Sequence, residues 1–105
     1  MSEVHSSTAF KDPHVVICDV PYPMKFGFRS YAIYNDRGNT NEDLQSPTKK
    51  TSALIELYYS GIVAGCERNK VPALTKDEFL DALDDQPGLF EQINESYQES
   101  TKVKK

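Results

Sequence analysis

Hydrophobic and polar positions along the chain change their spacing several times, and each change predicts a boundary between elements. Residues 14–20, HVVICDV, form an apolar run rich in β-branched side chains, which favours a strand. Residues 21–23, PYP, lack two backbone donors, so we expect a turn or a sheet edge there. Residues 24–28, MKFGF, alternate as a half-buried strand does. The two runs together predict an N-terminal β-hairpin.

After the second run the apolar spacing becomes three and four, which predicts a short helix over residues 29–36. Residues 37–47, RGNTNEDLQSP, show no period and indicate a flexible loop. Ser46 and Pro47 suit the N-cap and the first position of a long helix that continues to residue 69. Because this helix is apolar on most sides, we expect it to be the central element.

Two glycines of the long helix, Gly61 and Gly65, lie one turn apart beside small residues. Such positions let another backbone approach closely, and in a chain without a membrane span they more often fit a tight core. We expect the tight core, and an approaching helix stays open as the alternative.

Two helices are predicted for the C-terminal third. The stretch Thr75-Lys76-Asp77-Glu78 matches a capping box, in which the threonine hydroxyl and the glutamate carboxylate satisfy opposite backbone donors, so a helix begins at Thr75. Pro87 and Gly88 interrupt it, and residues 89–100 have the spacing of a last helix. The inward positions of that helix are Leu89, Phe90, Ile93 and Tyr97.

This order of elements predicts an α+β fold that is mainly α, with a short N-terminal β-hairpin followed by about four helices. A chain of 105 residues supports one modest core, which we place in a single domain over residues 14–100. Residues 1–13 are small and polar and predict a flexible arm, and residues 101–105, TKVKK, predict a basic tail.

Composition narrows the class of protein. The chain has 38% hydrophobic residues and no apolar run near the roughly eighteen that would span a bilayer, so no membrane association is expected. Its start lacks the basic and apolar regions of a secretory signal, so we expect a cytoplasmic protein. The net charge of −4 argues against a nucleic-acid partner, which would require a basic stripe.

The negative charge is concentrated near the C-terminus. Residues 75–100 hold eight acidic residues and one basic residue, whereas residues 1–74 hold eight of each. The segment resembles a helix leading into a calcium loop, but Pro87 and Leu89 occupy positions where oxygen ligands would be needed, so no metal is expected. A solvated helix face explains the charges, and a basic partner remains the alternative.

The residues that could carry chemistry are few. His5 and His14 lie in or near the predicted arm, where a proton shuttle could not be held in place. Cys18 and Cys66 have no metal-ligand or redox spacing, and we expect two buried thiols. No glycine-rich phosphate loop or nucleophile elbow is present in the sequence. We therefore predict no catalytic residues, no cofactor and no enzyme.

Aromatic residues are more numerous than a small core needs. Without interleaved Lys and Arg they are poorly suited to stack nucleobases, whereas tyrosine suits protein interfaces in which one edge stays wet. Core packing is the default for most of them, and we expect some to face a partner. The set is Tyr22, Phe26, Phe28, Tyr31, Tyr34, Tyr58 and Tyr59.

The order of these features resembles the small tail assembly chaperones of long-tailed bacteriophages. The resemblance covers roughly residues 14–100. It is carried by K-F-G-F at residues 25–28, the apolar helix ALIELYYSGIVAG at residues 53–65, and the pattern L-T-x-x-E-F-L-D-x-L-D-D at residues 74–85.

The resemblance implies a non-enzymatic protein of the bacterial host cytoplasm that coats the tape measure protein, recruits tail tube subunits and is absent from the finished virion. It also implies a frameshifted longer product whose junction would lie near residues 101–105. A homo-oligomer is possible. An aromatic groove would hold the client, and an acidic face around Asp81 and Asp85 would keep coated complexes apart. The candidate groove residues are Phe26, Phe28, Tyr31, Tyr58 and Tyr59.

Two readings from other classes remain open. A phage structural or connector protein would stay in purified virions and form a ring. A small acidic regulatory module, such as an inhibitor of a basic host protein, would carry acidic residues over most of its surface.

Overall fold

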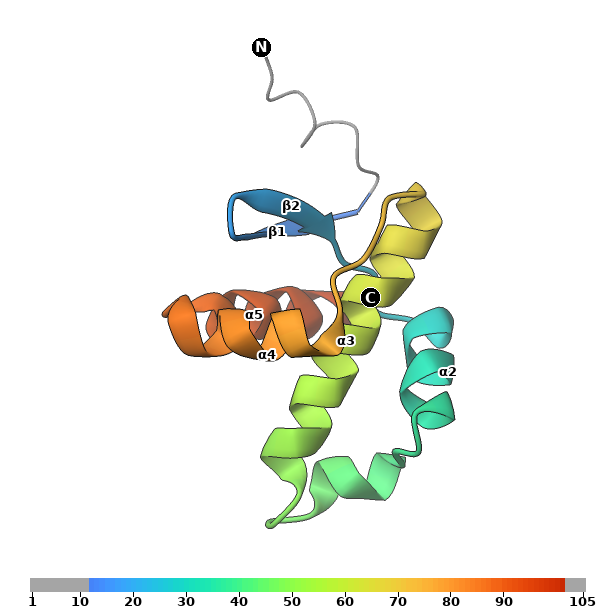
Figure 1. The fold of residues 1–105 in the computed structure, drawn as a ribbon. Coiled ribbons are helices and arrows are strands. Elements are labelled where there is room, and N and C mark those ends of the chain that lie inside the picture. The colour runs from blue at the N-terminus through green and yellow to red at the C-terminus, as the bar shows by residue number, and fades with distance from the viewer. Residues whose placement is uncertain (1–11, 102–105) are drawn as a thin grey trace.

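The structure is a computed structural model that describes residues 12–101. An antiparallel hairpin is followed by a short 3-10 helix and four α-helices within this range, which confirms the predicted class, α+β and mainly α (Figure 1). The predicted arm over residues 1–13 and tail over residues 101–105 lie almost wholly outside the described residues. The elements are β1 (His14–Ile17), β2 (Val20–Pro23), α2 (Phe28–Asp36), η1 (Asn41–Gln45), α3 (Lys50–Asn69), α4 (Lys76–Asp85) and α5 (Leu89–Thr101).

Helix α3 runs through the centre of the molecule, as its broad apolar surface predicts. In Figure 1, α4 and α5 cross α3 on one side and α2 packs along the other. Leu57, Tyr58 and Ile62 have no exposed surface, so burial of α3 from several directions organises the core. The helix begins at Lys50, later than predicted. Ser46 caps a preceding turn instead, with its hydroxyl oxygen accepting from the Lys49 N–H at 3.3 Å.

The second strand of the hairpin lies earlier in the chain than the predicted residues 24–28. Residues 20–23, which include PYP, form β2, and residues 24–28 are not a strand. The turn lies at Cys18 and Asp19, whose φ angles of 52° and 68° match the turn type that joins two-residue hairpins. That turn usually shows Asn-Gly or Asp-Gly, so Cys-Asp gave no signal. Cys18 is therefore exposed and its predicted burial is wrong, whereas Cys66 is buried as expected.

The two prolines of β2 fit this register. Pro21 pairs with Val16 and Pro23 pairs with His14. Hydrogen-bonded and non-hydrogen-bonded pairs alternate in an antiparallel ladder, so both prolines can occupy the positions whose missing N–H would point outward. The outer edge of β1 is covered differently, because the Gln86 amide nitrogen donates to the Val16 carbonyl at 2.8 Å. Both edges are thereby protected from pairing with another strand.

The glycines of α3 admit a neighbouring backbone. A Cβ at Gly65 would overlap the backbone of Pro23 and Met24, and a Cβ at Gly61 would overlap the Phe26 ring. The Lys25 N–H also donates to the Gly61 carbonyl at 2.9 Å. The tight-core interpretation is confirmed, and what approaches is the end of β2 together with the extended segment after it.

Helix α2 matches the predicted helix, but the predicted loop after it is structured. Its N-terminus is closed by Ser30, whose hydroxyl accepts from the Gly27 N–H at 2.9 Å. Within the connector, η1 is capped reciprocally: the Thr40 N–H donates to Asp43 Oδ2 at 3.1 Å and the Asp43 N–H to Thr40 Oγ1 at 3.3 Å. Thr40 and Asp43 have capping-box spacing, which could have been recognised in the sequence.

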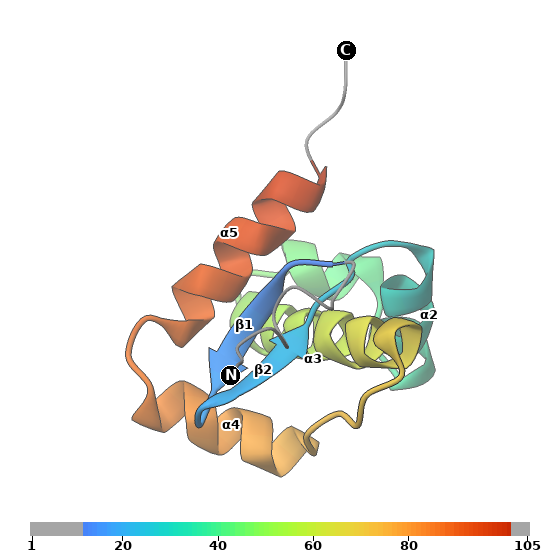
Figure 2. The same cartoon turned by 90° about the horizontal axis from the view of Figure 1, so that it is seen from above.

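The last two helices agree with the predictions. The Thr75 N–H donates to Glu78 Oε1 at 2.9 Å, and the Glu78 N–H donates to Thr75 Oγ1 at 3.1 Å, which completes the capping box. Leu89 and Ile93 of α5 are fully buried. Seen from above, the hairpin covers one end of α3 beside α5 (Figure 2). None of the helices in the described range combines the length and apolarity that a bilayer crossing requires.

Candidate protein-binding site

Two of the five predicted groove residues, Tyr58 and Tyr59, lie in the core. Tyr58 has 0% exposure, and its ring centroid lies 5.1 Å from that of Phe90 and 5.8 Å from that of Tyr97. Its hydroxyl donates to Asn94 Oδ1, and burial raises its pKa to about 12. Tyr59 is 9% exposed and donates its hydroxyl to the Leu74 carbonyl at 3.0 Å. The prediction that they line an open surface is wrong, because α4 and α5 cover this part of α3.

Phe28 is the most exposed large hydrophobic side chain of the described residues, at 97%. It occupies the first position of α2, beside a hollow of about 520 Å³ between α2 and η1. We call this the α2 hollow. It is lined by Phe28, Tyr31, Asn35, Asn41, Leu44 and Gln45, and none of these side chains carries a charge at neutral pH. The α2 hollow is thus an uncharged, largely apolar surface.

Tyr31 forms the inner wall of the α2 hollow. It is half-buried, and its hydroxyl lies 3.4 Å from that of Tyr97. Burial raises the pKa of Tyr31 to about 12, with a further contribution from Tyr97. The phenol is therefore neutral at physiological pH and can serve as a hydrogen-bonding edge, not as a base.

Phe26 faces a different surface from Phe28. Its ring meets that of Tyr97 edge-on at 5.2 Å, and it lines a groove of about 620 Å³ between residues 12–13 and 24–26 on one side and α5 on the other. We call this the α5 groove. Tyr97 joins the two surfaces, because it contacts both Phe26 and Tyr31. The sequence analysis placed Tyr97 only among inward residues and did not single out Leu44, which lies in the polar connector.

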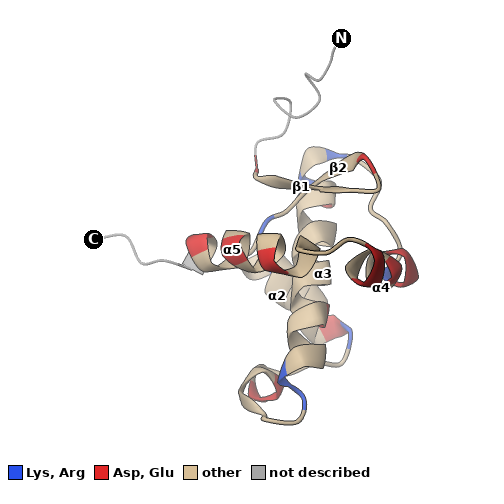
Figure 3. Cartoon of the chain, turned by 90° about the vertical axis from the view of Figure 1, so that its left-hand side faces the viewer, with Lys and Arg blue, Asp and Glu red and all other residues tan. Residues whose placement is uncertain are grey.

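The acidic candidates Asp81 and Asp85 are exposed on α4 and line neither the α2 hollow nor the α5 groove. Figure 3 shows the acidic residues of α4 and α5 on separate helices, with α5 to the left and α4 to the right of α3 in that view. The structure therefore brings Phe26 and Tyr31 together through Tyr97, places Phe28 beside Tyr31, and leaves the two aspartates apart from all of them.

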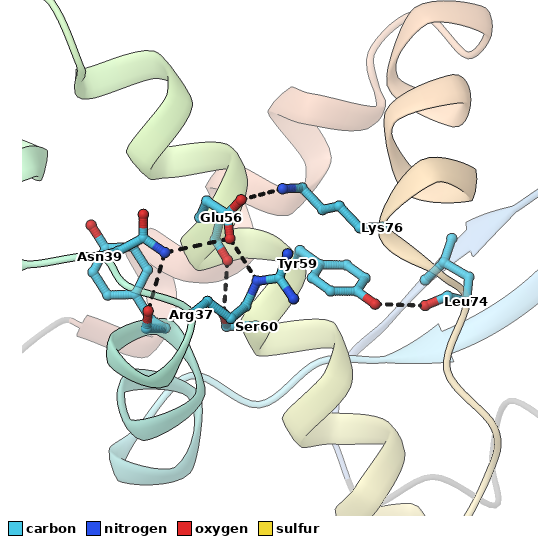
Figure 4. Close-up of polar contacts among 8 residues, drawn as sticks. Arg37, Asn39, Glu56, Tyr59, Ser60, Leu74 and Lys76 are labelled. Carbon is cyan, nitrogen blue, oxygen red and sulfur yellow. Dashed lines mark hydrogen bonds and ion pairs between the residues drawn. The ribbon is translucent and has the colours of Figure 1, made fainter.

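A polar cluster that the sequence analysis missed joins α3, α4 and the segment after α2 around Glu56. Arg37 Nε donates to Glu56 Oε1 at 2.7 Å, Lys76 Nζ pairs with Glu56 Oε2, and Asn39 Nδ2 lies 3.4 Å from Oε1 (Figure 4). Burial opposes ionisation of Glu56, but the hydrogen bonds from Arg37 and Lys76 outweigh it and lower its pKa. The guanidinium of Arg37 also lies 5.2 Å from the ring centroid of Tyr59. Both carboxylate oxygens of Glu56 are engaged in these contacts. We therefore assign the cluster a structural role, in which it holds α3, α4 and the segment after α2 together.

The remaining reactive groups offer little chemistry. Burial raises the pKa of the Cys66 thiol to about 11, which keeps it protonated and unreactive at neutral pH. Among residues 12–101 there is no group of three or more His, Cys, Asp or Glu side chains that could hold a metal ion. The described residues present apolar surface at the α2 hollow and the α5 groove, and acidic surface on α4.

Comparison of the chain with protein-family models, with curated proteins and with solved structures gives no match.

Proposed function

We propose that this chain is a non-enzymatic tail assembly chaperone of a long-tailed bacteriophage. It works in the cytoplasm of the bacterial host, binds the tape measure protein and helps to recruit tail tube subunits. The sequence pattern over residues 14–100 supports this assignment, and the observation that carries it is the exposure of Phe28 beside the α2 hollow.

An exposed phenylalanine at this position contributes little to the stability of the monomer. Burying such a side chain is worth about 1.5–3 kcal/mol, and here that free energy remains available for binding. The first turn of a helix usually favours acidic or polar residues, and Phe28 is neither. A side chain that contributes little to its own fold is best explained by contact with a partner.

The α2 hollow suits one mode of recognition. An amphipathic helix presents apolar side chains at intervals of three and four, and one of these could enter the hollow between Phe28 and Leu44. Because no charged side chain lines the hollow, the apolar contact carries no desolvation cost for a buried charge. A long helical client, which the resemblance implies, would present apolar segments of this kind.

The acidic residues of α4 have a separate part in the proposal. Asp81 and Asp85 face solvent away from the α2 hollow. Like charges on neighbouring chaperone molecules repel one another, which would keep coated clients in solution. This contribution weakens as ionic strength rises.

Capture of the tape measure protein by the tagged full-length chain tests the proposal. Phe28→Ser should lower recovery strongly, because it removes the main apolar contact. Val20→Ser is the matched control, since Val20 is also an exposed apolar residue, at 46%, but lies on the hairpin away from the hollow. Equal recovery by wild type and Phe28→Ser would exclude the α2 hollow as the client site. A stoichiometric amount of the chain in mature virions would instead favour a connector protein.

A further inference from the structure

Phe28 borders a second cavity besides the α2 hollow. This cavity has a volume of about 160 Å³, and we call it the basic pocket. We propose that the client segment whose apolar side chain enters the α2 hollow also carries an aspartate or glutamate, and that this carboxylate binds in the basic pocket. The inference rests on the proposed function, because it names the chemistry of the client segment. The pocket is lined by Lys25, Gly27, Phe28, Arg29, Ala64 and Arg68.

The positive charge of the basic pocket comes from three separate parts of the chain. Lys25 lies in the extended segment after β2, Arg29 in the first turn of α2 and Arg68 in the last turn of α3. Among residues 12–101, the lining includes no acidic side chain. Because the chain as a whole has a net charge of −4, this local excess of cations is the surface that best complements an acidic ligand.

Arg68 is held in position by contacts outside the pocket. Its Nε donates to Asp12 Oδ2 at 2.9 Å, and the Asp12 side chain, only 7% exposed, also accepts from Asn69 Nδ2 at 3.0 Å. A guanidinium carries five N–H donors in a planar fork, so pairing through Nε leaves the Nη donors for a second carboxylate. Asp12 therefore orients Arg68 without lining the pocket itself.

Arg29 is paired more loosely. Its Nη1 donates to Glu67 Oε1 at 3.1 Å, and more than half of each of these side chains is exposed. An exposed pair of this kind contributes little, so a client carboxylate can join Glu67 on the same guanidinium or replace it. Arg29 is thus available to a ligand although it has a partner within the chain.

Lys25 is shared between two surfaces. It takes part in none of the four ion pairs found within residues 12–101. It also lines the α5 groove, which has acidic side chains in its lining, whereas neither Arg29 nor Arg68 lines that groove. The two arginines are therefore the residues that assign a bound carboxylate to the basic pocket.

The shared residue Phe28 makes the two cavities one recognition surface. It lines the uncharged α2 hollow on one side and the basic pocket on the other. A helix places residues three or four positions apart on the same face, so an apolar anchor and a carboxylate one turn away can reach the two cavities together. A nucleic-acid strand also offers anions, but it would not supply the apolar anchor, and the chain lacks the overall basic charge that such a partner requires.

Two synthetic helical peptides of about four turns test the inference. Both carry a leucine stripe, and they differ only in having Glu or Gln along one flank. Fluorescence anisotropy with the full-length chain at physiological ionic strength should show about three- to tenfold tighter binding of the Glu peptide, since each exposed pair contributes modestly. The variant Phe28→Ser should weaken the binding of both peptides, because both use the α2 hollow.

The double variant Arg29→Gln, Arg68→Gln should abolish the preference for the Glu peptide and leave the affinity for the Gln peptide unchanged. Lys49→Gln with Lys50→Gln is the matched control, since it removes two charges from exposed positions that line neither cavity, and it should keep the preference. Circular dichroism checks that both double variants are folded. If loss of the Asp12 partner unfolds the first, Arg29→Gln alone should still reduce the preference by about twofold.

Four results would overturn the inference. They are equal affinity of the wild type for the Glu and Gln peptides, an equal loss of preference in the two double variants, unchanged binding of the Glu peptide by Phe28→Ser, and tighter binding of a single-stranded oligonucleotide than of the Glu peptide. The last result would identify the ligand of the basic pocket as a phosphate backbone.

Failure here is distinguishable from failure of the proposed function. If the Arg29→Gln, Arg68→Gln chain captures the tape measure protein as well as the wild type does, the acidic client residue is excluded while the chaperone assignment stands. If the wild type binds the Glu peptide with the expected dependence on Phe28 and the two arginines but captures no tape measure protein, the recognition of an acidic helix is supported and the chaperone assignment fails.

Discussion

Two pairs of aromatic residues in this protein have opposite surroundings. Tyr58 and Tyr59 of α3 are sealed in the core, whereas Phe28 and Tyr31 of α2 border an open hollow. The residue types are alike and both pairs lie on helices. The difference comes from their neighbours: α3 is contacted by α2, η1, β2 and α5, but α2 packs mainly on α3 and leaves its other side to solvent.

The comparison teaches that an aromatic residue of α2 is available for binding only where it lies on the side of the helix that α3 does not cover, since Tyr34 of the same helix packs against Ala53 and Leu57 and is fully buried. On α3, each aromatic side chain finds another ring or a backbone acceptor, such as Phe90 for Tyr58 and the Leu74 carbonyl for Tyr59. On α2, Phe28 finds none among the described rings. Stability measurements can test this contrast directly.

Tyr58→Ala should have the largest effect. It removes a fully buried ring that touches Phe26, Phe90 and Tyr97, so the free energy of unfolding should fall by about 3–5 kcal/mol. Urea denaturation followed by circular dichroism measures the change. A loss below about 1 kcal/mol would show that Tyr58 is not a core residue and would restore the prediction that it faces a partner.

Gly65→Ala should come next, at about 1–3 kcal/mol, because the new Cβ would overlap the backbone of Pro23 and Met24. Gly61→Ala is the companion variant. The atoms nearest to its Cβ would belong to the Phe26 ring, and a side chain can shift more easily than a backbone, so its loss should be smaller. Thermal unfolding of both variants would contradict the proposed close approach if Gly61→Ala were the more harmful.

Glu56→Gln should lower stability by about 1–3 kcal/mol at neutral pH, because the hydrogen bonds from Arg37 and Lys76 lose their charged acceptor. The pKa of Glu56 is lowered in the folded state, so its contribution is present above the usual glutamate range and disappears as pH falls through the folded-state value.

Denaturation across acidic pH measures this contribution. The stability of the wild type should fall toward that of Glu56→Gln as the carboxylate becomes protonated. A constant difference between the two proteins down to the lowest pH tested would show that the ion pairs with Arg37 and Lys76 are not its source.

Phe28→Asp should have the smallest effect on stability, within about 0.5 kcal/mol, because the side chain is almost wholly exposed and an acid at a helix N-terminus is favourable. Tyr31→Ala, which removes a half-buried ring, should fall between Phe28→Asp and Tyr58→Ala. Differential scanning fluorimetry ranks the three, and a strong loss for Phe28→Asp would mean that Phe28 packs within the fold and not against a partner.

Local signals in the sequence were sufficient for most helices. The capping box at Thr75, the interruption at Pro87 and the spacing of Leu89 and Ile93 predicted α4 and α5 nearly to the residue. The hairpin was recognised but its second strand was misplaced, because the Cys18-Asp19 turn lacks the residues that usually mark it. Helix α3 begins later than predicted because Ser46 caps a turn and not the helix itself.

The candidate site was less predictable. Phe26, Phe28 and Tyr31 were named from the sequence and do border open surfaces, but Tyr58 and Tyr59 were named with them and are buried. The spacing of apolar residues shows which of them share a face of a helix. It does not show how many faces of that helix are covered by other elements. Tyr97 and Leu44 became recognisable only once distant elements were brought together.

The sequence by itself determined the α-helices and the presence of a hairpin, because caps, prolines and apolar spacing act between residues that are close along the chain. It also determined where acidic residues are concentrated. The tertiary structure alone decided which aromatic rings are sealed, that the segment after β2 lies on Gly61 and Gly65, and that Glu56 joins Arg37 to Lys76. These outcomes depend on which elements pack against one another, because a side chain is buried only when residues distant in the sequence cover it.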